Sequence, residues 1–340
     1  MINQFAIKNF GMLRDLELDR LGSINLIIGE NGSGKTFMLK AIYSAMRTIE
    51  EFERGDDKRT ESEILAEKLY WTFQTEKIGD LVSKNSAEPL SFEITLDDQK
   101  FMYKFGKDTT KHIPCLTNRT QKRSSNSVFL PSKEVLSIYH IILKSREHDK
   151  LFGFDDTYLD LVRALSIPRK GGRNYPEFAD SRKALDELLG GKVEFDDNTK
   201  RWIFKRGNQK YAIGVTAEGI KKIAILDTLL ANRYLDTDSI IFIDEPESAL
   251  HPAAISDLLD IIAVLSERGI QFFLASHSIF VLKKLALIAR ERNISIPLIS
   301  LPGSDKYQVR YDNLQNGVPD NSIICESIRL YEEEIGGVLE

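Results

Sequence analysis

The fold of this chain follows from one octapeptide, Gly29-Glu30-Asn31-Gly32-Ser33-Gly34-Lys35-Thr36. It fits the pattern G-x-x-x-x-G-K-[ST] of a phosphate-binding loop. An apolar run at 24–28 precedes it and predicts a strand, and residues 37–49 predict a helix. Glycines let the backbone turn tightly, so that consecutive N–H groups converge on a phosphate at the helix N-terminus. We therefore predict that residues 30–36 bind a nucleotide.

Two side chains of this loop have distinct predicted roles. The Lys35 ammonium is expected on the β- and γ-phosphates, and the Thr36 hydroxyl on Mg²⁺. The alternative is a glycine-rich turn that fits the pattern by chance. Because kinases, GTPases, helicases and transporter motors share the loop, it does not by itself identify the nucleotide machine.

Composition describes an ordinary globular protein. The 340 residues, with 42% hydrophobic and 29% charged side chains, suit one large α/β domain with an insertion or two modest domains. No apolar stretch approaches the ~18 residues that span a bilayer, and the N-terminus lacks a basic-then-apolar leader. We expect a cytoplasmic protein with no membrane contact. Cys115 and Cys325 have no CxxC partner, which argues against a disulfide framework or a zinc site.

Charge gives a mixed indication about nucleic acid. The formal net charge of −5 is not that of a dedicated nucleic-acid binder. Two basic stretches, 111–123 and 169–173, leave open either solvated loops or a direct contact with nucleic acid.

Periodicity predicts three consecutive parts, at residues 1–131, 132–190 and 191–340. The first begins with strands near 5–10, 13–18 and 24–28, followed by a surface excursion at 50–64 and a hairpin that turns at Asp97-Asp98. The second is an inserted helical lobe with helices at 135–142, 159–165 and 184–189. The third returns to a sheet with strands at 202–204 and 211–213.

Two further strands end in groups suited to phosphate chemistry. The run 239–243 is apolar throughout, as in a parallel strand buried on both faces, and leads into Asp244 and Glu245. Ligands of open α/β sheets gather at the carboxyl ends of the strands, so Asp244 is predicted in the Mg²⁺ shell and Glu245 beside the attacking water. The alternative is a strand that merely exits into an acidic turn.

A histidine follows the strand predicted at 271–275. His277 is placed to donate a hydrogen bond to the γ-phosphate, which would make it a sensor of that group. The alternative is a histidine with a purely structural role.

The order of these motifs resembles that of ABC-type ATPases. The run Asp244-Glu245-Pro246-Glu247-Ser248-Ala249-Leu250-His251-Pro252, followed by His277, is similar to their Walker B, D-loop and switch histidine. The Leu-His-Pro form looks like the SMC-related branch with the RecF-like and OLD-like (overcoming lysogenization defect) ATPases. Residues 216–224 occupy the place of the signature loop. The likeness covers nearly the whole chain.

The resemblance implies a fold and a mechanism. The fold is an α/β ABC-ATPase-like head, with a mixed sheet around the phosphate-loop helix, an antiparallel β-subdomain and an inserted helical lobe. Two heads would form a homodimer face to face around ATP and Mg²⁺. Gly219 and Glu218 would then touch the γ-phosphate bound by the partner, while Ala249 and Leu250 line the dimer seam. Hydrolysis, with Glu245 as the catalytic base, would release the heads.

Two departures from the family pattern affect the expected activity. Ala217 stands where the family has a signature serine, which leaves Thr216 or backbone N–H groups to compensate and suggests slow or partner-dependent hydrolysis. No glutamine occupies 131–134, where the family's glutamine loop is expected, so Ser132 or Glu134 would take its place near the metal.

The C-terminal part is too short for the Toprim nuclease that several relatives carry. Only 63 residues follow His277, fewer than the ~100 of a typical domain. We therefore expect a nuclease or toxin effector on a separate chain.

Three functions remain open. The first is an ATPase that acts as sensor, switch or motor for that effector, in phage defence or DNA repair. The second is a nucleotide-gated scaffold that does not hydrolyse ATP. The third is an ATP-dependent DNA clamp built on the basic stretches.

Overall fold

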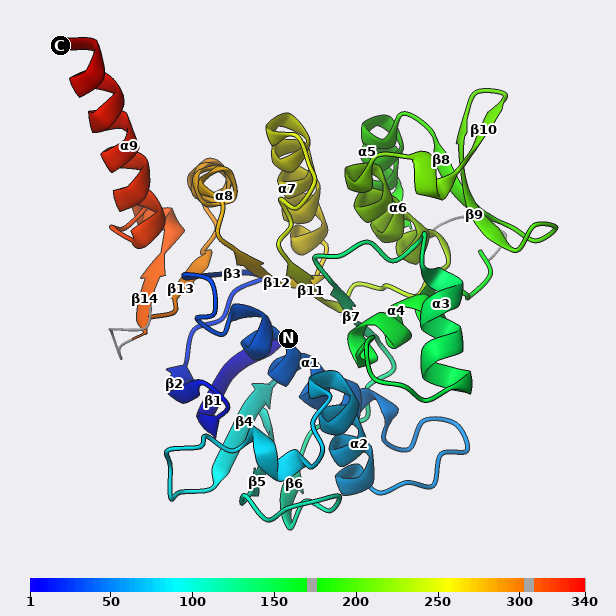
Figure 1. Cartoon of the computed structure of the whole chain (residues 1–340), viewed down its shortest axis with the longest axis vertical. Helices are drawn as coiled ribbons and strands as arrows, with labels where there is room; N and C mark the ends of the chain where they lie inside the picture. Colours follow the sequence, from blue (N-terminus) through cyan, green and yellow to red (C-terminus); the bar gives the residue numbers. More distant parts are fainter. Residues whose placement is uncertain (170–175, 303–308, 340) are drawn as a thin grey trace.

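A six-stranded sheet forms the centre of the computed structural model, which describes residues 1–169, 176–302 and 309–339 (Figure 1). In sheet order the strands are β14 (Arg310–Asn313), β13 (Pro297–Ser300), β3 (Ile24–Ile28), β12 (Gln271–Ser276), β11 (Ile240–Asp244) and β7 (Ser127–Leu130). All neighbours are parallel except β14, which pairs antiparallel with β13. Three of the predicted strands, β3, β12 and β11, are therefore neighbours, and their carboxyl ends lie at one edge of the sheet. They lead into the phosphate loop, His277 and Glu245.

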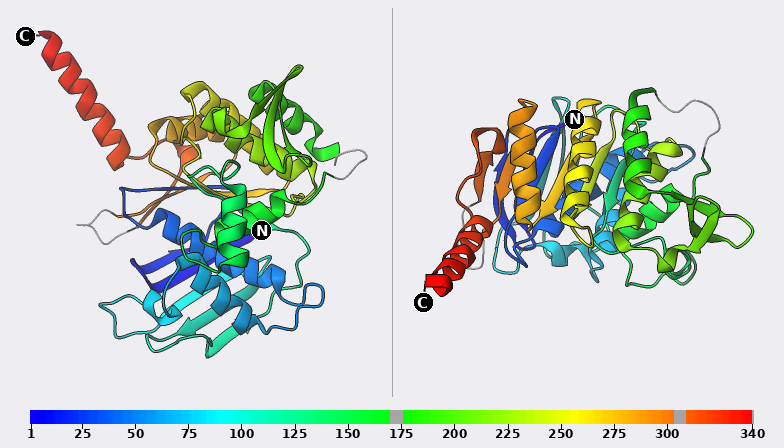
Figure 2. Two further views of the ribbon diagram at one scale, coloured as in Figure 1. Left: turned by 45° about the vertical axis from the view of Figure 1, so that its right-hand side comes forward. Right: turned by 90° about the horizontal axis from the view of Figure 1, so that it is seen from above.

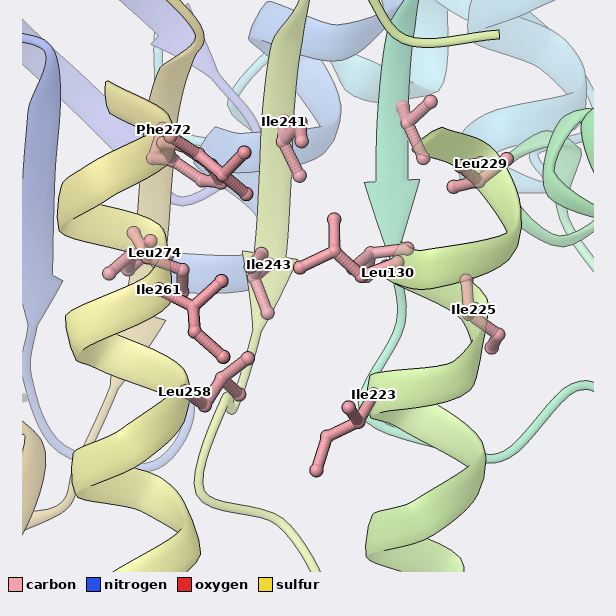
Figure 3. Close-up of a cluster of buried hydrophobic side chains, with 14 of the residues drawn as sticks. Leu130, Ile223, Ile225, Leu229, Ile241, Ile243, Leu258, Ile261, Phe272 and Leu274 are labelled. Carbon is pink, nitrogen blue, oxygen red and sulfur yellow. The ribbon is translucent and has the colours of Figure 1, made fainter. Parts of the chain in front are cut away.

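One face of this six-stranded sheet, the core sheet, packs on helices α6 (Glu218–Ala231), α7 (Pro252–Glu267) and α8 (Ile279–Glu291) (Figure 1). Alternate strand residues such as Ile243 and Leu274 point toward Leu258 and Ile261 of α7 (Figure 3). The residues between them, among them Phe273, belong to the core on the other face. Burial on both faces explains why these strands are apolar throughout.

The other face covers α1 (Lys35–Glu51), which lies between the core sheet and a five-stranded antiparallel sheet (Figure 1). In order the latter contains β2 (Leu13–Leu18), β1 (Ile2–Phe10), β4 (Leu90–Leu96), β5 (Gln99–Phe105) and β6 (Cys115–Asn118). Asp97 and Asp98 both have positive φ, of 48° and 64°, as a two-residue hairpin turn requires, so the predicted hairpin is confirmed. The α/β head with its antiparallel subdomain is also confirmed.

Helix α2 (Glu61–Phe73) was not predicted, and its first turn lies in the expected surface excursion at 50–64. The side chain of Thr60 accepts from the N–H of Glu63, while the Glu63 carboxylate accepts from the N–H of Thr60. This capping box was the available sequence signal.

The inserted lobe is less regular than predicted. It contains α3 (Tyr139–Leu143), a π-helical turn (Lys144–His148), α4 (Asp156–Leu165) and α5 (Ala179–Leu189). The helix predicted from 135 begins only at Tyr139. Val135 is nevertheless fully buried, so its periodic spacing reflected core packing rather than a helix.

The strands predicted at 202–204 and 211–213 do not rejoin the core sheet. They belong to a separate three-stranded antiparallel sheet of β10 (Gln209–Ala212), β9 (Arg201–Arg206) and β8 (Lys192–Asp196). The Trp202 ring lies 6.0 Å from the Tyr139 ring of the lobe. We propose that this sheet belongs to the lobe. Short 3₁₀ turns occupy Ile78–Leu81, Pro176–Phe178, Ile213–Val215 and Leu314–Asn316.

The structure describes all of the basic stretch 111–123 but only Arg169 of the stretch 169–173. Lys122 donates to the carbonyl of Glu53, and Arg123 contacts Glu50 and the carbonyl of Asp238. These cations support the fold of the head. The stretch 169–173 lies outside the described residues except for Arg169, whose side chain donates to the Val193 carbonyl.

Helix α9 (Ser322–Leu339) projects from the body beyond α8 (Figures 1 and 2). Ile323 and Ile324 at its base pack against the core, whereas Ile328 and Tyr331 are exposed. Across the described ranges, the helices are too short or too polar to cross a bilayer.

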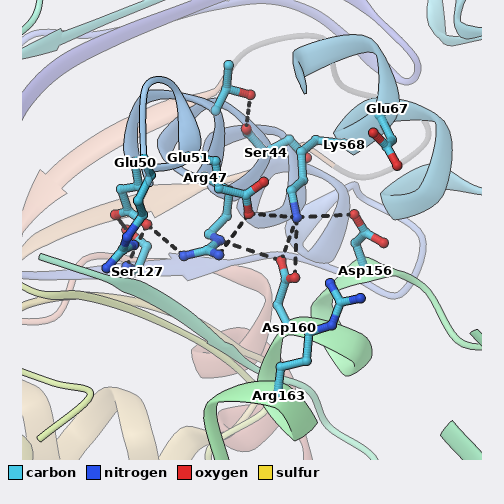
Figure 4. A network of polar contacts seen from close by, with 12 residues as sticks. Ser44, Arg47, Glu50, Glu51, Glu67, Lys68, Ser127, Asp156, Asp160 and Arg163 are labelled. Carbon is cyan, nitrogen blue, oxygen red and sulfur yellow. Dashed lines mark hydrogen bonds and ion pairs between the residues drawn. The ribbon is translucent and has the colours of Figure 1, made fainter. Parts of the chain in front are cut away.

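A buried ion network joins the end of α1 to α2 and α4 (Figure 4). Lys68 Nζ lies 3.0 Å from Asp160 and 2.9 Å from Glu51, and Arg47 lies 2.8 Å from Glu51 and 3.5 Å from Asp160. Although burial opposes its ionisation, the two cations lower the pKa of Asp160 to about 2. The network therefore fixes the lobe helix α4 against the helix that carries the phosphate loop.

Asp160→Asn is expected to lower the free energy of unfolding by roughly 3–5 kcal/mol, because it leaves Lys68 and Arg47 buried without one of their anions. Denaturant titration followed by circular dichroism measures the loss. Asp260→Asn is the control, since Asp260 pairs with Lys284 at 2.7 Å on a surface where its side chain is 44% exposed; that change should cost no more than about 1 kcal/mol. Equal losses would contradict the structural role of the network.

Candidate functional site

The phosphate loop has the backbone shape that its glycines predict. Gly32 and Gly34 have φ of 79° and 99°, in the region that other residues rarely adopt. Gly34 immediately precedes α1 and has no side chain that could cap it. The first N–H groups of α1 thus face the loop, where the helix dipole favours an anion.

Lys35 lies inside this loop. Its Nζ donates to the carbonyls of Gly29 and Glu30 at 2.8 and 2.9 Å. Burial lowers the pKa of Lys35, and the nearby carboxylates of Asp244 and Glu245 oppose that shift. A partly desolvated cation is therefore held where the predicted phosphates would bind.

Thr36 and Asp244 form a pair suited to Mg²⁺. Thr36 Oγ1 donates to both carboxylate oxygens of Asp244, at 2.9 and 3.0 Å. Adjacent ligands of an octahedral ion with bonds of 2.0–2.1 Å are about 2.9 Å apart, so the two oxygens already have a suitable separation. Burial raises the pKa of Asp244, and the bond from Thr36 opposes that shift. One hydroxyl and one carboxylate leave the remaining positions for phosphate and water, as Mg²⁺ prefers.

Beyond this pair, the described ranges contain no group of three or more His, Cys, Asp or Glu side chains placed to hold a metal. Cys115 and Cys325 are exposed free thiols.

Glu245 and His277 meet at the ends of β11 and β12. His277 Nδ1 lies 3.6 Å from Glu245 Oε1, and both side chains reach solvent, with exposures of 50% and 36%. Glu245 has a left-handed φ of 51°, and its N–H donates to the Ala275 carbonyl of β12 at 2.8 Å. The two groups predicted to act on the γ-phosphate and its water are thus adjacent, and both reach solvent.

Two residues beside Glu245 had no predicted role. Glu247 accepts from the Ser276 hydroxyl at 2.8 Å and from the His277 N–H at 3.2 Å, so it holds the turn that carries the histidine. Its other oxygen, Oε2, is buried and accepts no hydrogen bond from any residue that the structure describes. A third acid two positions after Glu245 was the available signal.

Lys222 of α6 is the second of these residues. Its Nζ donates to the Glu245 carbonyl at 2.6 Å, and burial lowers the pKa of Lys222 to about 8 against the attraction of Glu247, Asp244 and Glu245. Its distance in sequence from Glu245 gave no signal of this contact.

The predicted signature loop opens α6. Ala217 is the N-cap and offers no side-chain acceptor, while the Thr216 hydroxyl donates to the Ile213 carbonyl at 2.5 Å. The Thr216 hydroxyl is thus bonded within its own chain, and its compensation for the missing serine stays a prediction. Glu218 Oε1 accepts from Lys221 at 2.7 Å.

Gly219 lies against the D-loop of its own chain. A Cβ at this position would lie 2.5 Å from Leu250 Cδ2 and 3.0 Å from the Ala249 carbonyl. A side chain at position 219 would therefore force the Leu250 side chain to move. Among the contacts of described residues, those of Glu218 and Gly219 are with α6, Ala249 and Leu250, and none is with the phosphate loop. Their predicted role toward ATP bound by a partner chain stays a prediction.

The segment after β7 also contacts the signature helix. Glu134 accepts from the Ser137 N–H at 2.8 Å and lies 3.7 Å from Lys221 Nζ. Ser132 and Glu134 line a cavity of about 280 Å³ together with Glu218 and Ala249. Their predicted place near the metal remains a hypothesis.

His251 has a structural role at the other end of the D-loop. Its Nδ1 accepts from the Ala253 N–H at 3.2 Å and caps α7, whose first residue is Pro252. Proline suits this position because its missing N–H is not needed there.

Sequence comparisons connect the site with known proteins. A family model described as "AAA domain, putative AbiEii toxin, Type IV TA system" matches residues 24–283. An ATP/GTP phosphatase from Helicobacter pylori is 23% identical over 353 residues, covering 91% of this chain and 94% of that protein. A DNA replication and repair protein RecF from Oenococcus oeni is 30% identical over 100 residues, which cover 29% of this chain and 24% of the RecF chain.

Solved structures share the fold. An SMC head bound to the C-winged helix domain of ScpA aligns with a TM-score of 0.57 at 14% identity, covering 93% of this chain and 98% of that one. An SMC head with an extended coiled coil, bound to the C-terminal domain of ScpA derived from Pyrococcus furiosus, aligns with a TM-score of 0.53 at 13% identity, covering 96% and 99%. The fold is that of an ABC-ATPase-like head.

Proposed function

Because the chain belongs to the AAA-domain family described as putative AbiEii toxin, and is an ABC/SMC-like AAA ATPase of the RecF/OLD type, we propose that it binds ATP with Mg²⁺ and hydrolyses it within a head-to-head dimer. The observation that carries this proposal is the contact between Thr36 and Asp244. It joins the first turn of α1 to the last residue of β11, next to Glu245. A hydroxyl beside a carboxylate is a ligand pair that suits Mg²⁺.

Each side chain then has one task. Lys35 binds the β- and γ-phosphates, and Thr36 and Asp244 hold Mg²⁺. Glu245 orients and deprotonates the attacking water, since its carboxylate is open to solvent at the strand end. His277 donates a hydrogen bond to the γ-phosphate, and its ring lies beside the Glu245 carboxylate.

A second copy of the chain completes the site in this proposal. Glu218 is 51% exposed at the start of α6 and would reach the γ-phosphate bound by the partner. Gly219 is buried against Ala249 and Leu250, and the exposed Ala249 with the half-buried Leu250 would lie at the dimer seam. ATP shared between the two chains would favour the closed state over the open one.

A nucleotide-gated scaffold is the second candidate. It is favoured by Ala217, which removes a hydroxyl from the signature loop, and by the bond that diverts Thr216 to Ile213. In that case the dimer would form on ATP, and turnover would be negligible. A DNA clamp has less support, because Lys122 and Arg123 make contacts within the head.

We propose a separate effector, a nuclease or toxin, as the partner that the switch controls. Phage defence and DNA repair are the proposed settings. The family description names a putative toxin of a type IV TA system, and one relative is a DNA replication and repair protein. The cytoplasm is the proposed compartment.

Hydrolysis should require Mg²⁺ and the Asp244 carboxylate. Asp244→Asn is expected to lower ATP turnover about 100-fold or more, because a neutral amide binds Mg²⁺ poorly and the developing charge on the phosphates is less stabilised. Phosphate release at increasing Mg²⁺ concentration measures the effect, and high Mg²⁺ should recover part of the rate. Asp260→Asn, on the exposed face of α7, should be unchanged. Turnover that is independent of both Mg²⁺ and Asp244 would contradict the assignment.

A further inference from the structure

Two adjacent lysines in the first turns of α6 are largely buried, which is costly for a charged group unless it has partners. The Lys221 side chain is 2% exposed and contacts Glu218, Glu134 and Ser137. Lys222 points in a different direction, because neighbouring helical residues lie about 100° apart around the axis. Its described contact is with the Glu245 carbonyl.

Lys222 contacts a residue with a strained backbone. Glu245 has a left-handed φ of 51°, a conformation that costs of order 1 kcal/mol or more for a residue with a side chain. Its N–H donates to the Ala275 carbonyl at 2.8 Å, and its carbonyl accepts from Lys222 Nζ at 2.6 Å and from the Ser248 N–H of the same loop at 3.0 Å. Both polar groups of the Glu245 main chain are therefore fixed from two different elements, and together they set the direction of its carboxylate.

Lys222 also shares a helix turn with the signature loop. It is three residues after Gly219, a rise of about 4.5 Å along α6. Gly219 in turn touches Ala249 and Leu250, the residues that follow Glu245 in the same loop. A shift at the start of α6 would therefore move the Lys222 ammonium relative to the Glu245 carbonyl.

We propose that Lys222 is a positioning residue that couples the signature end of α6 to Glu245 in the same chain. When the partner's nucleotide binds at Glu218 and Gly219, it would fix the position of α6. Lys222 would then hold Glu245 in the orientation that hydrolysis needs. The inference rests on the proposed ATPase function. It links nucleotide binding at the partner's phosphate loop to hydrolysis at this chain's own phosphate loop.

The test compares Lys222→Met with Lys222→Arg in the full chain. Met fills a similar volume without a donor, whereas Arg keeps a cation that can donate to a carbonyl. Lys222→Met is expected to lower kcat about 10- to 100-fold, the scale of a misplaced catalytic group. The KM for ATP and the ATP-dependent dimerisation should change less than about twofold. Lys222→Arg should restore kcat to within about threefold of the wild type.

A double-mutant cycle separates positioning from general loss of stability. If Lys222 acts through Glu245, Lys222→Met in a Glu245→Gln background should cause no further decrease in turnover. Lys222→Gln replaces Lys222→Met in the cycle if the latter fails to fold, with the same expectation for kcat. The inference would be overturned if the losses of turnover from the Lys222 and Glu245 changes added in the double variant. A kcat unaffected by both Lys222→Met and Lys222→Gln would overturn it as well. A wild-type protein without Glu245-dependent hydrolysis would instead overturn the proposed function.

Discussion

Lys35→Ala is expected to abolish ATP binding and, with it, ATP-dependent dimerisation. The Lys35 ammonium is the cation inside the phosphate loop, where it donates to Gly29 and Glu30 and lies near Asp244. Hydrogen bonds to charged groups contribute about 1.5–3 kcal/mol each, so losing those to two phosphates should weaken binding at least about 100-fold. Calorimetric titration with ATP and Mg²⁺ measures the affinity, and light scattering measures the mass.

Lys283→Ala is the matched control, since Lys283 is exposed on α8. It should bind ATP and dimerise like the wild type. If Lys35→Ala still dimerised with ATP present, the dimer would not depend on the phosphate loop, and the composite site would be wrong.

Glu245→Gln is expected to lower turnover about 10²- to 10⁴-fold, the usual contribution of a general base. The amide has nearly the shape of the carboxylate, so the main-chain bonds to Ala275 and Lys222 should persist. ATP affinity should therefore remain within a few fold of the wild type. Phosphate release and calorimetry on the same preparation separate the two quantities.

Glu291→Gln, at the exposed end of α8, removes an equal charge away from the site and should leave turnover unchanged. Equal background release from the wild type and Glu245→Gln would favour the scaffold function, in which ATP binding matters and turnover does not.

The central sheet and the backbone shape of the phosphate loop could be predicted from sequence because their signals are local. The glycines around Lys35, the apolar runs and the Asp97-Asp98 turn each determine the geometry of their own segment. The predicted order of Asp244 and His277 follows from the rule that ligands gather at the carboxyl ends of parallel strands.

The parts that could not be predicted depend on partners distant in sequence. Asp160 is buried because Lys68 and Arg47 reach it from α2 and α1, and no local pattern shows this. The contact of Lys222 with the Glu245 carbonyl, likewise, exists only once α6 packs on the six-stranded sheet. Val135 had helical spacing but lies in an irregular segment, because core packing alone can produce that spacing.

The mass of the Glu245→Gln protein with ATP and Mg²⁺ tests the composite site most directly. Slow hydrolysis should keep both nucleotides in place between Lys35 of one chain and Glu218 of the other. Light scattering is done at protein concentrations above those at which half of the wild-type chains are dimeric with ATP. It should then give twice the 38.7 kDa of one chain, and the mass should fall to that of one chain when ADP replaces ATP. A protein that binds ATP by calorimetry yet remains at 38.7 kDa would contradict the head-to-head dimer.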